Sequence, residues 1–116
     1  MKENAVKDKS FQFAIRIVKI YEHLTGVKKE YVLSKQLLRS GTSVGAMVRE
    51  AQHAESKADF KHKLAIAQKE INESLYWLEL MKETDYLREV EFKSIHSDAT
   101  EVLKLLTSIL KTTKSN

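Results

Sequence analysis

Long helical segments are the feature that most limits what this chain can fold into. Its 116 residues include no proline and only three glycines, so few positions interrupt a helix. In four segments, apolar residues recur at steps of three and four residues, which is the spacing of one helix face. We therefore predict an all-α fold with helices at about 9–24, 30–55, 57–83 and 89–111.

Each predicted helix carries one inward row of apolar or small residues. In the last two segments the rows keep a heptad register, which is typical of helices that pack along their length. The rows are Phe13, Ile17, Ile20 and Leu24, widened by Ala14, Val18 and Tyr21; Leu33, Leu37, Ser40, Val44, Met47 or Val48, and Ala51; Phe60, Leu64, Ala67, Ile71, Ser74, Leu78 and Met81; and Phe92, Ile95, Ala99, Val102, Leu106 and Ile109.

Short connections join these segments. Gly26 is placed to end the first helix in the left-handed conformation, and Ser56 is placed to cap the third, with Asp59 at the capping-box spacing. Short links between long amphipathic helices make neighbours antiparallel, so we predict an up-down-up-down four-helix bundle. The length predicts one domain over residues 1–116, with only residues 1–6 and 112–116 frayed.

A run of small residues, Ser40 to Ala46, lies inside the second predicted helix. Two interior glycines cost about 1 kcal/mol each in helix propensity relative to Ala, so tertiary packing must compensate. The G-x-x-x-G spacing predicts close approach of another helix through the packing residues Ser40, Gly41, Val44, Gly45 and Ala46. A phosphate-binding loop is the alternative, but Ala46 and Met47 follow the last glycine where that loop needs Lys and then Ser or Thr.

The third segment is apolar on nearly every side between residues 75 and 81. A helix of this kind is normally buried on all sides, which is more than a four-helix core provides. We therefore predict a homo-oligomer with Tyr76, Trp77 and Leu80 at its interface. In the alternative, Trp77 only covers one end of the bundle with its ring partly exposed.

Basic residues form rows on the first two segments. Lys35, Arg39, Arg49 and His53 fall on one face of the second, while Arg16 and Lys19 belong to a looser row on the first. The formal net charge is +4, so these rows are candidate contacts for RNA or DNA. A charge row is also the ordinary solvated face of an amphipathic helix, and that alternative stays open.

No residue pattern predicts a metal, a cofactor or a catalytic group. Glu50-x-x-His53 and Asp59-x-x-His62 have a spacing found in di-iron bundles. However, His53 points away from the inward row of its helix, and no acidic residue follows Glu101. No signature pairs a Ser or Thr nucleophile with a base, so we predict a protein that is not an enzyme.

The chain also lacks signs of secretion or membrane insertion. It has no cysteine, which fits a reducing compartment. No stretch approaches the roughly 20 apolar residues that span a bilayer. We therefore expect a cytoplasmic protein without a membrane partner.

Several runs of residues recur in one known family: Arg39 to Ala46, Arg49 to Gln52, Ala54 to Phe60, Lys63, Leu64, Lys69, Glu70, Glu73, Tyr76 to Leu80, Asp98, Ala99, and Leu105 to Ile109. In these runs the chain resembles the bacterial four-helix bundle family encoded in intervening sequences of 23S rRNA genes, some of whose members are labelled ribosomal proteins. The resemblance covers roughly residues 30–114 and departs from the family at Met47, where Asn is common, and at Asp85, where Gly is common. Asp tolerates left-handed geometry, so we expect the last turn to survive.

The resemblance implies a left-handed bundle that assembles as a homopentameric ring around a channel. It also implies kinship with the accessory protein of diversity-generating retroelements, a basic pentamer that binds reverse transcriptase and nucleic acid. Two hypotheses follow for this chain. One is a non-enzymatic pentamer that contacts RNA or DNA, and the other is a protein-interaction scaffold that contacts neither.

Overall fold

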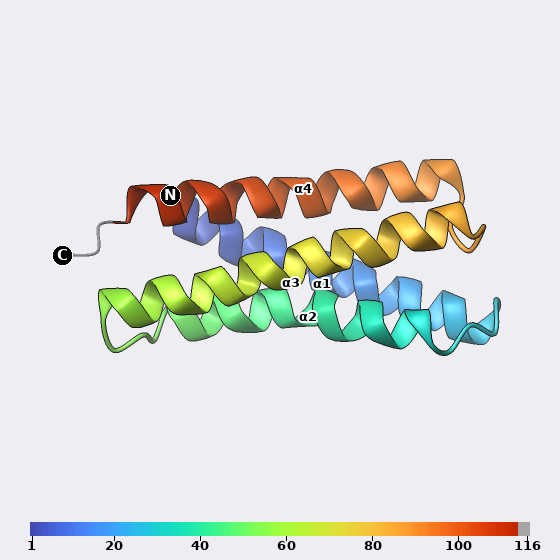
Figure 1. The fold of residues 1–116 in the computed structure, drawn as a ribbon, viewed down its shortest axis with the longest axis horizontal. Helices are drawn as coiled ribbons and strands as arrows, with labels where there is room; N and C mark the ends of the chain where they lie inside the picture. Colours follow the sequence, from blue (N-terminus) through green and yellow to red (C-terminus); the bar gives the residue numbers. More distant parts are fainter. Residues whose placement is uncertain (114–116) are drawn as a thin grey trace.

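The computed structural model describes residues 1–113 and shows an elongated molecule of 49 × 21 × 19 Å (Figure 1). It consists of four helices: α1 (Lys2–Gly26), α2 (Leu33–Ala51), α3 (Lys57–Glu83) and α4 (Glu89–Thr112). No strand occurs within residues 1–113, so the predicted all-α class is confirmed.

The four helices lie around one shared core. Each helix contacts the next one along the chain, and α4 also contacts α1, whereas the diagonal pairs α1 with α3 and α2 with α4 do not approach within 8 Å between Cα atoms. Most residues of the predicted inward rows are buried in this core. The buried members are Phe13, Ile17 and Leu24; Leu37, Ser40, Val44, Val48 and Ala51; Leu64, Ala67, Ile71, Ser74, Leu78 and Met81; and Ile95, Ala99, Val102, Leu106 and Ile109.

The first helix begins earlier than its apolar period suggested. It starts at Lys2, so the prediction that residues 1–6 are frayed is wrong for Lys2 to Val6. Val6 is only 2% exposed and extends the inward row beyond Phe13, and Lys2 Nζ donates to Ser108 Oγ of α4 at 2.7 Å. Packing against α4 therefore holds the first turns. Within the predicted frayed C-terminus, α4 includes Thr112, while residues 114–116 lie outside the described part of the chain.

The second helix is shorter than the predicted range 30–55. Its start is displaced because the Glu30 carboxylate accepts hydrogen bonds from the N–H groups of Leu33 and Ser34 at 3.0 and 2.7 Å. Its end is followed by a tight turn before Ser56, whose extended backbone begins α3. Ser56 Oγ accepts from Asp59 N–H at 3.0 Å, which confirms the predicted N-cap.

The left-handed positions correct one prediction and confirm another. Gly26 is the last residue of α1 and has no positive φ, so the prediction that it ends the helix in the left-handed conformation is wrong. Lys29 takes that conformation instead, with φ 58°. Asp85 has φ 67° in the last connection, as expected for a residue that tolerates this geometry.

Val18 was wrongly assigned to the inward side of the first helix, because it is 40% exposed. Phe11 and Ile15 are exposed on the same helix, at 47% and 37%. At 100° per residue these three side chains fall within about 60° of one another. They form an outward apolar row on α1. The sequence did not predict this row, because Val18 was assigned to the inward side.

Candidate interaction surfaces

The glycines of α2 allow α1 to approach closely. A Cβ added at Gly41 would lie 2.8 Å from Ile17 Cγ1, and one at Gly45 would lie 3.4 Å from Ser10 O. The first distance is shorter than real carbon contacts, so a side chain at Gly41 would displace the buried Ile17. The helix-propensity cost of Gly41 is thus offset by close packing of α2 against α1.

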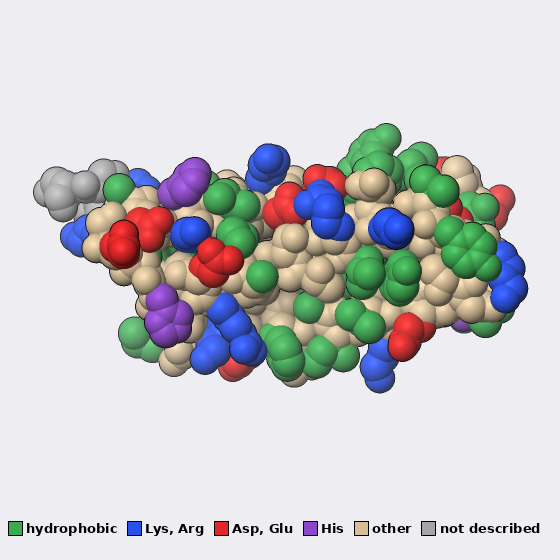
Figure 2. Space-filling model, turned by 90° about the horizontal axis from the view of Figure 1, so that it is seen from below, with side chains coloured by type: hydrophobic (Ala, Val, Ile, Leu, Met, Phe, Trp, Pro, Cys, Tyr) green, Lys and Arg blue, Asp and Glu red, His purple; other side chains and the backbone are tan. Residues whose placement is uncertain are grey.

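The other small residues of the run have different environments. Val44 is fully buried, and Ser40 Oγ lies 2.8 Å from Ser74 Oγ of α3, so a hydrogen bond joins two helices inside the core. Ala46 is exposed, so the close contact predicted for it stays a prediction. Figure 2, seen from the side on which α2 lies, shows mainly uncharged side chains over the middle of this face, between charged clusters.

Arg39 is held by carboxylates of the neighbouring helix. Its guanidinium pairs with Glu70 at 2.8 Å and with Glu73 at 2.5 Å, both on α3. Glu73 also accepts a hydrogen bond from Trp77 Nε1 at 3.0 Å. The hydrogen bond from Trp77, followed by that from Arg39, holds the pKa of Glu73 below its usual range. Arg39 therefore joins α2 to α3 in addition to belonging to the predicted basic row.

Arg16 is engaged in the same way between α1 and α4. Its guanidinium pairs with Asp98 and donates to Ser94 Oγ at 3.0 Å. Lys19 remains exposed and lines, with His23 and other residues, a hollow of about 270 Å³ between these helices. Of the two predicted contacts on α1, only Lys19 has no carboxylate partner within residues 1–113.

All four members of the basic row on α2 are exposed, but within residues 1–113 only Arg39 is paired with carboxylates. Lys35, Arg49 and His53 form no ion pair within the described residues. The Arg49 guanidinium lies 4.9 Å from the centre of the Phe11 ring, a cation–π contact that positions it. His53 lies by the α2–α3 connection in a hollow that also contains acidic side chains, including Glu55. The predicted basic row therefore consists of one exposed residue that is paired and three exposed residues that are not paired in the described part of the chain.

The outer side of α3 exposes apolar side chains. Tyr76 is 57% exposed, and its ring meets the half-buried Trp77 ring edge-on at 5.0 Å. Leu80 is half-buried and lines a hollow of about 400 Å³ with Tyr76 and Glu79. Contact of these residues with another copy of the chain stays a prediction.

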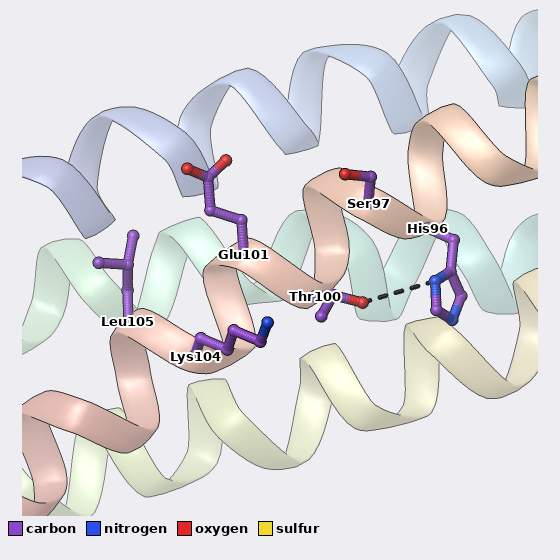
Figure 3. Close-up of a pocket in the computed structure, with 6 residues that line it drawn as sticks. All are labelled: His96, Ser97, Thr100, Glu101, Lys104 and Leu105. Carbon is purple, nitrogen blue, oxygen red and sulfur yellow. Dashed lines mark hydrogen bonds between the residues drawn. The ribbon is translucent and has the colours of Figure 1, made fainter.

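A hollow of about 510 Å³ on α4 does not bring reactive side chains from different helices together. Figure 3 shows that its six lining residues all come from this helix and that Glu101 and Lys104 point to different sides. Thr100 Oγ1 and His96 Nδ1 lie 3.5 Å apart there. A catalytic site brings groups from several elements to one point, which this arrangement does not do.

The described residues include neither a metal-binding cluster nor a membrane-spanning helix. Within residues 1–113 no group of three or more His, Cys, Asp or Glu side chains is placed to hold a metal ion. In the same part of the chain, no helix is both long and apolar enough to cross a membrane.

These features define the class as an all-α, four-helix protein with charged rows and apolar patches on its helices. The chain belongs to the family described as 23S rRNA-intervening sequence protein, which matches residues 2–108. The predicted family is thus confirmed.

A solved crystal structure is very similar to this fold. It is that of a protein of unknown function from the S23 ribosomal protein family of Bacteroides thetaiotaomicron VPI-5482. The two sequences are 57% identical, the TM-score is 0.96, and the match covers 97% of this chain and 100% of that chain. No curated protein matches the chain.

Proposed function

We propose that this chain is a non-enzymatic homo-oligomer that binds RNA or DNA through exposed basic side chains. The observation that carries this proposal is the exposure of Lys35, Arg49 and His53 on α2 without ion pairs in the described residues. Cations that are not paired within the chain are available to phosphates, and the net charge of +4 favours an anionic partner.

The proposed architecture is an antiparallel, up-down-up-down bundle with a left-handed twist that forms a pentameric ring. The short connections 27–32, 52–56 and 84–88 support antiparallel neighbours. Membership of the family supports the twist and the ring. A ring repeats each weak phosphate contact, so avidity raises the affinity for a long nucleic acid.

Two exposed apolar areas support assembly. One is the row Phe11, Ile15 and Val18 on α1, and the other contains Tyr76 and the half-buried Leu80 on α3. Contiguous apolar side chains on a small protein are typical of contact surfaces. Size-exclusion chromatography with light scattering tests this part, and a monomer at every concentration contradicts it.

Fluorescence anisotropy with structured RNA and with DNA, repeated across salt concentrations, tests nucleic-acid binding. We expect Lys35→Ala with Arg49→Ala to weaken binding and to lower the dependence of log affinity on log salt. Lys104→Ala with Lys111→Ala is the matched control, because it removes two exposed cations from α4. Absence of binding at low salt, or an unchanged salt slope, contradicts the proposal.

The second candidate is a protein-interaction scaffold, which the exposed Tyr76 surface on α3 favours. A pulldown from the native organism, with and without nuclease, separates the two candidates. Partners that survive nuclease support the scaffold, and partners that are lost support nucleic-acid binding.

A further inference from the structure

The connection between α1 and α2 exposes side chains that the fold does not use. Val27, Tyr31 and Val32 are 66%, 57% and 71% exposed, and Lys28 and Lys29 between them are exposed as well. This connection lies at the end of the molecule away from the N-terminus (Figure 1), and Figure 2 shows hydrophobic and basic side chains together at that end. Apolar and basic side chains grouped on one short segment are typical of a binding surface.

Glu30 holds this connection in a defined conformation. Its backbone N–H donates to Leu24 O of α1 at 2.9 Å, and its carboxylate accepts from Ser34 N–H of α2 at 2.7 Å. Because Glu30 is turned inward and tied to both helices, its neighbours Lys29 and Tyr31 are left in solvent. The first N–H groups of α2 are already occupied, so an anion at this position would be held by lysine side chains.

We propose that residues 27–32, named here the tip, bind single-stranded nucleic acid. Tyr31 stacks on a base, and Lys28 and Lys29 contact the adjacent phosphates. The inference rests on the proposed function, since it names the part of the chain that holds the strand. An exposed aromatic ring stacks on any unpaired base, and lysines beside it follow the backbone.

The neighbouring α3–α4 connection favours a strand over a flat anionic surface. Asp85 is exposed at the same end of the bundle, as are Glu83 and Glu89, which lie 3.8 and 3.7 Å from Lys82 Nζ. A membrane with negative headgroups would meet these carboxylates together with the lysines. A single strand is narrow enough to follow the lysines alone. A duplex keeps its bases stacked on one another, so it presents Tyr31 with little to stack on.

Anisotropy titrations of the full chain with a labelled single-stranded RNA and with a duplex of the same length test the proposal. Tyr31→Ala should weaken single-strand binding about tenfold and leave duplex binding unchanged, while Tyr31→Phe, which keeps the ring, should retain the affinity. Lys28→Gln with Lys29→Gln should lower the salt slope for the single strand by about 1.4, the value for two phosphates. Lys104→Gln with Lys111→Gln is the matched control and should leave the slope unchanged.

The outcomes separate this inference from the proposed function. If the wild-type chain binds no nucleic acid at low salt, both are overturned. If it binds, and only Lys35→Ala with Arg49→Ala weakens binding, the proposed function survives and the tip is overturned as the site. If the tip variants lose only binding to vesicles of equal parts phosphatidylserine and phosphatidylcholine, the tip is a lipid contact.

Equal losses for Tyr31→Ala and Tyr31→Phe overturn the stacking role. Circular dichroism and light scattering verify that each variant keeps its helices and its oligomeric state.

Discussion

The two connections at the end of the bundle away from the N-terminus reverse the chain in contrasting ways. Both use one left-handed residue, Lys29 in the α1–α2 connection and Asp85 in the α3–α4 connection. In the second, the apolar Leu87 is only 5% exposed. In the first, Tyr31 and Val32 are mostly exposed.

The two connections also differ in whether their charged side chains form ion pairs. In the α3–α4 connection, Arg88 pairs with Glu91 at 3.3 Å, and Lys82 and Glu89 on either side of the connection pair at 3.7 Å. In the tip, Lys28 and Lys29 have no ion pair within residues 1–113. Arg88 of the α3–α4 connection is thus paired within the chain, whereas the two lysines of the tip have no ion pair in the described residues.

The largest effect should come from the buried side chain of the α3–α4 connection. Leu87→Ala removes a core side chain and should cost about 2–4 kcal/mol in the free energy of unfolding. Val32→Ala in the tip should cost less than about 0.5 kcal/mol, because Val32 is exposed. Urea denaturation at one fixed protein concentration measures both, and equal losses would remove the contrast between the connections.

The next effect concerns the carboxylate that anchors the tip. Glu30→Gln should lower stability at neutral pH by about 1–2 kcal/mol, because the charged acceptor of the first α2 N–H groups is lost. Glu89→Gln, at an exposed position in the first turn of α4, is the control and should change stability much less. A loss for Glu89→Gln as large as that for Glu30→Gln would contradict the anchoring role.

A smaller effect should appear in the pH dependence of stability. Burial raises the pKa of Glu30, but N–H hydrogen bonds from Leu33, Ser34 and Val32 outweigh burial and leave it below 4.5. This carboxylate therefore stabilises the fold fully above pH 4.5, and its contribution is lost as pH falls through the lowered pKa. Denaturant midpoints across acidic pH should show a weaker decline for Glu30→Gln than for the wild type. A decline equal to that of the wild type would contradict the prediction.

The smallest effect should come from the left-handed residues. Lys29→Gly should raise stability by up to about 1 kcal/mol, because Lys has a steric cost at φ 58° that Gly lacks. Asp85→Gly should change stability less, since Asp tolerates this conformation. Thermal or urea unfolding of the two variants measures the difference. A larger gain at Asp85 would reverse the expected order of strain.

Local signals predicted much of the fold. The spacing from Ser56 to Asp59 predicted the start of α3, and the apolar period predicted most core positions. These succeeded because capping and helix periodicity depend on residues a few positions apart. The start of α1 at Lys2 was missed because contacts with α4 hold its first turns.

The sequence predicted the candidate surfaces less completely than it predicted the fold. Helix angles group Arg16 and Arg39 with other basic residues, but they do not reveal the partners Asp98 and Glu70, which are on other helices. The sequence did not predict the conformation of residues 27–32, because Gly26 is a typical helix terminator whereas the hydrogen bonds that fix this connection are made by Glu30.

The sequence by itself determined that this protein is helical, which faces of most helices are buried, and to which family it belongs. Those properties follow from short-range periodicity and from a recognisable run of residues. Only the tertiary structure decided which charged and apolar groups remain exposed. An ion pair such as Arg39 with Glu70 depends on how two helices are aligned in space, and no local pattern encodes that alignment.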